Sequence, residues 1–76
     1  MKVPASAHHI LKIIVDKLHV STPDADVTAL IMERLTKAAR KSKNPMPDKA
    51  TCDMYCREAL KIHHANRALF NKVMRG

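Results

Sequence analysis

The stretch from Thr51 to Arg67, TCDMYCREALKIHHANR, places two cysteines four residues apart and follows them with an adjacent pair of histidines. Thiolate sulfur and imidazole nitrogen are the usual ligands of structural zinc in proteins. A thiolate beside a cation or at a helix N-terminus is also a nucleophile. The first question is therefore whether these side chains can meet at one site.

A helix places Cys52, Cys56 and His63 on one apolar face, at about 100° of rotation per residue, but not at one point. With a rise of about 1.5 Å per residue, Cys56 and His63 are about 10 Å apart along the axis. A zinc–sulfur bond is only about 2.3 Å long, and the familiar zinc spacings are absent. We therefore expect no metal site and no cofactor, and two reduced cysteines that pack as small apolar side chains.

Catalysis is not indicated either. Cysteines four apart on a helix have poorly directed Cβ vectors for a disulfide, and an apolar face opposes a reactive thiolate. The members of the pairs His8-His9 and His63-His64 point about 100° apart. The acids are scattered at helix starts and in helix-stabilising pairs, whereas acid–base chemistry needs paired titratable groups in a cleft. We expect a non-catalytic protein.

His63 and Asn66 are the two polar residues on the apolar face of the same helix. A buried His or Asn must find hydrogen bonds or cost about 1–3 kcal/mol. Two interpretations stay open. The pair belongs to a satisfied network in or at the edge of the core, or it lies at a seam between helices, where a polar residue fixes register or partner number.

Periodicity and start signals predict three helices, over residues 7–19, 23–41 and 48–74. Ser6 is a plausible N-cap for the first, and Ser21 or Thr22 for the second, with Pro23 in its first turn. On the first helix the apolar residues gather on one side and the histidines on the other. The apolar side comprises Ile10, Leu11, Ile14, Val15 and Leu18.

The only glycine is Gly76, so the chain lacks the residue that hairpin turns and phosphate-binding loops require. Pro45 and Pro47 break the chain between the second and third helices. The sequence therefore predicts a single all-α domain, residues 1–76, whose second and third helices form an antiparallel hairpin. The apolar run at Ile13–Val15 is too short for a signal peptide or a membrane span, and we expect a cytoplasmic protein.

The charge balance favours anionic partners. There are 14 Lys and Arg against 7 Asp and Glu, a net charge of +7, which suits nucleic acid, a membrane surface or an acidic protein. Residues 34–49 hold six basic residues and one acid, a net +5. The residues expected to bind nucleic acid or an acidic partner are Arg34, Lys37, Arg40, Lys41, Lys43, Lys49, Arg57 and Lys61.

The length of the predicted third helix indicates that two copies of the chain associate. At about 40 Å it is twice as long as the first, so part of it lacks a partner helix within one chain. Exposed large apolar side chains there cost about 1.5 kcal/mol or more each. We expect a homodimer, unless the first helix folds back over this part. The expected interface comprises His63, Asn66, Leu69, Phe70, Val73 and Met74.

Two functional hypotheses follow. The first is a small nucleic-acid-binding regulator that contacts the phosphate backbone; Tyr55 and Phe70 are its only aromatic residues besides histidine, which disfavours single-strand binding by base stacking. The second is a protein-interaction adaptor, or an inhibitor of a larger acidic protein. Ionic strength separates them, because phosphate binding weakens steeply with salt.

Overall fold

The computed structural model describes residues 3–75 and contains three helices. They are α1 (Ala5–Asp16), α2 (Asp24–Ser42) and α3 (Lys49–Arg75). No strand occurs in this part of the chain, and the all-α prediction is confirmed. The helices begin and end within three residues of their predicted bounds.

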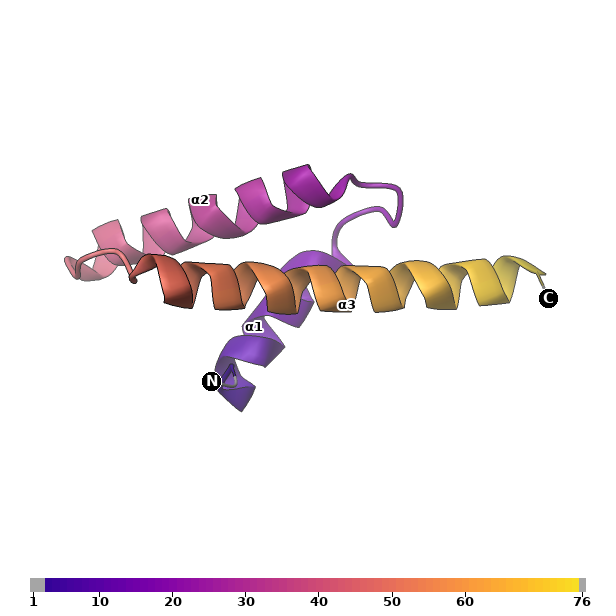
Figure 1. Cartoon of the computed structure of the whole chain (residues 1–76), viewed down its shortest axis with the longest axis horizontal. Helices are drawn as coiled ribbons and strands as arrows, with labels where there is room; N and C mark the ends of the chain where they lie inside the picture. Colours follow the sequence, from indigo (N-terminus) through magenta and orange to yellow (C-terminus); the bar gives the residue numbers. More distant parts are fainter. Residues whose placement is uncertain (1–2, 76) are drawn as a thin grey trace.

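The long helix α3 is the axis of the molecule, which measures 48 × 22 × 18 Å. Helix α2 lies antiparallel along its N-terminal half, and α1 crosses it near the middle (Figure 1). Both α1 and α2 pack on α3 and make much less contact with each other. The C-terminal part of α3 extends beyond both of them (Figure 1).

The helix starts show which local signals decide the fold. Asp48 is the first residue of the predicted third helix. In the structure its Oδ1 accepts a hydrogen bond from the Thr51 backbone N–H at 3.0 Å. The predicted caps of the other two helices are wrong. Ser6 lies inside α1, and the residues at the two N-cap positions are Pro4 and Pro23. Proline occupies these positions because its carbonyl still accepts the first helical hydrogen bond.

Helix α1 ends at Asp16, three residues before the predicted end. The amides of Lys17 and Leu18 bond to carbonyls three residues back, which tightens the last turn. Helix α2 ends at Ser42, and the next residue, Lys43, is left-handed with φ 58°. The amide of Asn44 then reaches back to the Ala39 carbonyl at 3.0 Å, which closes the helix by the usual left-handed stop.

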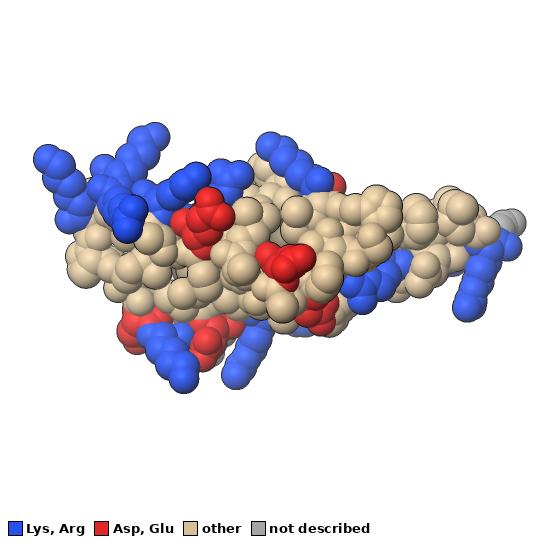
Figure 2. Space-filling model, turned by 90° about the horizontal axis from the view of Figure 1, so that it is seen from above, with Lys and Arg blue, Asp and Glu red and all other residues tan. Residues whose placement is uncertain are grey.

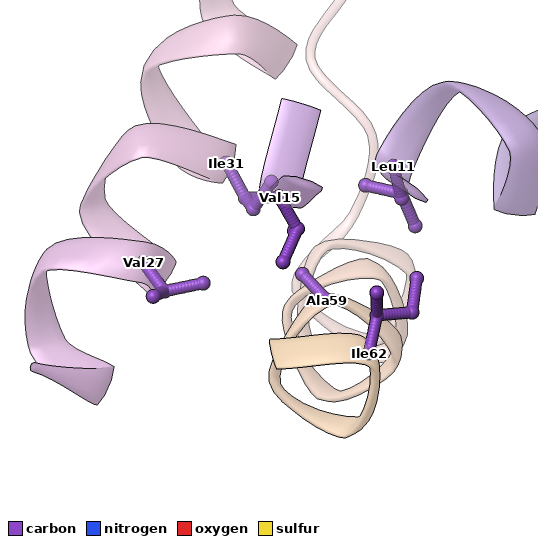
Figure 3. Close-up of a cluster of buried hydrophobic side chains, with 6 residues drawn as sticks. All are labelled: Leu11, Val15, Val27, Ile31, Ala59 and Ile62. Atoms are coloured by element: carbon purple, nitrogen blue, oxygen red, sulfur yellow. The ribbon is translucent and has the colours of Figure 1, made fainter. Parts of the chain in front are cut away.

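The core forms where the three helices meet (Figure 3). Val15 and Val27 are fully enclosed, and Ile31 is 1% exposed. The first helix buries only part of its predicted apolar side, since Ile10 is 58% exposed. That expectation is wrong for Ile10 because α1 contacts α3 but barely contacts α2. The six core residues are Leu11, Val15, Val27, Ile31, Ala59 and Ile62.

Candidate functional site

Two polar side chains of α3 fix the link between α1 and α2. His63 is fully buried, and its Nε2 lies 2.8 Å from the carbonyl oxygen of Thr22. Since a carbonyl only accepts, Nε2 carries the proton. The Arg67 Nε donates to the Val20 carbonyl at 2.9 Å, and its Nη2 donates to that of Thr22 at 3.2 Å. His63 is thus enclosed by its own chain, and its predicted place at a seam between two chains is wrong.

Asn66 is also satisfied within the chain. Its Nδ2 donates to Asp16 Oδ1 at 2.7 Å, while Lys12 Nζ donates to Asp16 Oδ2 at 2.8 Å. Both hydrogen bonds lower the pKa of Asp16, and the one from Lys12 has the larger effect. Asn66 is only half-buried. The interpretation of a satisfied network at the edge of the core therefore describes it.

The remaining histidine contacts join helices across the surface. His8 Nδ1 lies 2.9 Å from Glu58 Oε1, and 46% of the His8 side chain is exposed, so the polar side of α1 reaches the edge of α3 at this residue. His64 Nε2 lies 2.9 Å from Asp24 Oδ2, and both side chains are about half exposed. These pairs are separate from one another. Within residues 3–75 no group of three or more His, Cys, Asp or Glu side chains is placed to hold a metal ion.

Both cysteines are free thiols on the packed side of α3. Cys52 is buried, and its Sγ lies 3.5 Å from the Pro47 carbonyl oxygen. Burial raises the pKa of the Cys56 thiol, and the nearby Cys52 and Asp53 add to this effect. A raised pKa lowers the thiolate fraction of Cys56 at neutral pH.

The structure gathers six of the predicted basic residues at one end of the molecule. Figure 2 shows Lys and Arg side chains concentrated at the end that holds the α2–α3 loop. All six side chains are exposed. In the described part of the chain only Lys37 among them forms an ion pair, with Glu33 at 3.4 Å. We call this set the basic cluster: Arg34, Lys37, Arg40, Lys41, Lys43 and Lys49.

Arg57 and Lys61 do not face the same way as the basic cluster. Each is two residues from the buried Ala59, which places it about 160° around the helix from the packed side. They are exposed on the side of α3 that faces away from α2.

The C-terminal apolar strip comprises Leu69, Phe70, Val73 and Met74, which are 61%, 43%, 69% and 71% exposed. Helix α1 does not fold back over it. Within the strip, Phe70 lies near the His19 ring of the α1–α2 link, with ring centroids 6.4 Å apart. A single chain therefore leaves the apolar strip exposed to solvent, as we expected.

Sequence reasoning missed a groove of about 230 Å³ between α1 and α2. It exists because these two helices both pack on α3 and diverge from each other. Among residues 3–75, Arg34 is its only charged lining residue. The excess of apolar residues on the first helix, including the exposed Ile10 and Ile13, was the available signal. The groove is lined by Ala7, Ile10, Leu11, Ile14, Ile31, Arg34, Leu35, Ala38 and Tyr55.

Among the described residues, no helix has both the length and the hydropathy that crossing a bilayer requires. The chain matches no protein family model, no curated protein and no solved structure. The basic cluster, the apolar strip and the groove are the surfaces of the molecule that could bind a partner.

Proposed function

We propose that this protein is a non-catalytic nucleic-acid-binding module that contacts the phosphate backbone through the basic cluster. The observation that carries the proposal is the gathering of six exposed cations at one end of a chain of net charge +7. Five of them have no acidic partner within residues 3–75, so their charge is available to a ligand.

The cluster suits phosphates better than base edges. Arg40 and Lys41 belong to the last turn of α2, Lys43 follows in a left-handed turn, and Lys49 begins α3. These four side chains extend from a helix end and a loop, and only Arg34 and Lys37 lie further back along α2. Cations placed this way give sequence-independent affinity by releasing counterions from the duplex.

The proposed unit is a homodimer. The apolar strip is the large exposed apolar surface at the end of α3 away from the basic cluster (Figure 1). A second copy that packs its own strip antiparallel against it covers both strips. The two basic clusters then lie at the two ends of an elongated particle, where they contact separate stretches of one duplex.

The test compares two variants that lose the same charge. In the first, Arg40, Lys43 and Lys49 of the cluster become Gln; in the second, the exposed residues Lys17, Arg57 and Lys61 outside it become Gln. Affinity for a short fluorescein-labelled DNA duplex is measured by anisotropy from about 50 to 200 mM salt. Each phosphate contact that is lost reduces the slope of log affinity against log salt by about one.

We expect the cluster variant to lose up to about three units of that slope per chain, and the matched variant to keep most of it. Circular dichroism should show the same helical signal for both, because exposed charges contribute little to folding. Equal losses for the two variants would mean that only net charge matters and would reject the cluster as the site. The absence of salt-dependent binding in the wild type would reject the function itself.

A further inference from the structure

We propose that the groove between α1 and α2 binds an acidic amphipathic helix of another protein. The groove is open, and its walls are two helices that share the support of α3 but diverge from each other. The lining residues of α1 run from Ala7 to Ile14, and those of α2 from Ile31 to Ala38. Each wall is therefore about 10 Å long, or two helical turns. A bound helix would take the open fourth position of a four-helix bundle.

The lining defines the apolar face of the occupant. Eight of the nine lining residues are uncharged, and Arg34 is the exception. Ile10 is 58% exposed on one wall, and Ala38 is exposed on the other. A helix with apolar side chains at spacings of three and four residues covers both walls at once.

The charge along one edge defines the rest of the occupant. Arg34, Lys37 and Lys41 recur at spacings of three and four, so they lie within about 60° of one another on α2. Arg34 lines the groove, and the other two lie just outside it on the same side. Lys37 Nζ forms an ion pair with Glu33 Oε1 at 3.4 Å, and both side chains are exposed. The charge of Lys37 is therefore partly neutralised within the chain. None of the lining residues in the described part of the chain is acidic, so the complementary helix carries Asp or Glu along one flank.

A second copy fits this description less well. The free helix of the chain is the end of α3, and no acid follows Glu58 in the sequence. The apolar strip of a second copy would therefore bring no partner for the three cations. A nucleic acid would engage the cations but leave the apolar walls uncovered. The acidic amphipathic helix is the occupant that satisfies both parts of the surface.

The probe is a designed peptide of about five helical turns, with Leu at spacings of three and four, Glu along one flank, and fluorescein at one end. A second peptide carries Lys in place of every Glu. Anisotropy with the full chain should show that the acidic peptide binds and that the basic peptide binds at least about tenfold more weakly. Similar affinity for the two peptides would overturn the proposal.

A matched pair of variants locates the site. Ile10→Glu places a charge inside the groove, whereas Ile13→Glu places one on the same helix outside it. Ile10→Glu should weaken the acidic peptide by about tenfold or more, and Ile13→Glu should leave the affinity within about twofold. Ala38→Glu on the opposite wall gives an independent check. Unchanged peptide affinity in Ile10→Glu and Ala38→Glu would reject the groove.

The two proposals fail separately. Ile10→Glu should keep its duplex affinity, because Ile10 carries no charge and contacts no phosphate. The cluster variant Arg40, Lys43 and Lys49 to Gln should keep the peptide, because Arg34 and Lys41 remain. Loss of peptide binding in the cluster variant would place the peptide on Arg40, Lys43 and Lys49, at the loop end and away from the groove, and would overturn the groove proposal. If both ligands bind as proposed, they share Arg34, Lys37 and Lys41 and should compete.

Discussion

Two adjacent histidines of α3 have opposite surroundings. His63 is fully buried and donates from Nε2 to the Thr22 carbonyl, while His64 is about half exposed beside Asp24. The helical period separated them correctly, because it placed His63 on the apolar face and His64 off it. It could not supply the partner of His63, since the Thr22 carbonyl comes from a link that is 41 residues away along the chain.

We predict that His63→Ala lowers the free energy of unfolding by about 2–4 kcal/mol, because it removes a buried hydrogen bond and leaves a cavity. His64→Ala should cost less than about 1 kcal/mol, since its contact with Asp24 is exposed. Chemical denaturation followed by circular dichroism measures both. Equal effects would show that the His63–Thr22 contact does not fasten the link. His63→Gln, which keeps a donor, should recover part of the loss.

At the scale of the elements, the sequence predicts where a helix forms more accurately than which side of that helix is packed. Two prolines and Asp48 define the start of α3, because these residues act on their own backbone within one turn. The packed side of α1 was predicted only in part. Leu11 and Val15 are buried, but Ile10 is exposed and His8 contacts Glu58. Which flank of an apolar helix is covered depends on the crossing angle and on the neighbouring helix. The periodicity of apolar residues within one helix determines neither of them.

The start of α3 gives a pH-dependent prediction. Hydrogen bonds from Thr51 lower the pKa of Asp48 below its usual value. A carboxyl whose pKa is lower in the folded state stabilises the fold above its unfolded pKa, and this contribution disappears as the pH falls through the folded value. Asp48→Ala should therefore lower the melting temperature at pH 7 and lower it less near pH 2.

Asp48→Asn is the matched control for that variant, because an Asn side chain still caps a helix but does not titrate over this range. It should melt close to the wild type at pH 7. A loss for Asp48→Ala that is the same at both pH values would show that the carboxylate has no role in the cap.

At the scale of the whole molecule, charge and apolar surface are separated along α3. The basic cluster lies at the loop end, and the apolar strip lies at the other end (Figures 1 and 2). The sequence predicted the strip because an apolar face continued past the reach of a shorter helix. The helical period places Arg57 and Lys61 on the side of α3 opposite its apolar face, but where that side lies relative to the cluster depends on which side of α3 receives α2. The sequence did not predict the groove, which exists only through the divergence of α1 and α2.

The exposed apolar strip leads us to predict that the protein is a dimer in solution. Sedimentation should give wild-type protein twice the 8.5 kDa mass of one chain, because pairing removes four large apolar side chains from water. Phe70→Glu and Val73→Glu should each sediment as single chains, whereas Met32→Glu, at a partly exposed position of α2, should keep the wild-type mass. Lys72 and Arg75 flank the strip, so salt should screen their repulsion and strengthen the dimer while it weakens duplex binding. A wild-type chain that stays at 8.5 kDa across the micromolar range, or a dimer that Phe70→Glu leaves intact, would contradict pairing through the strip.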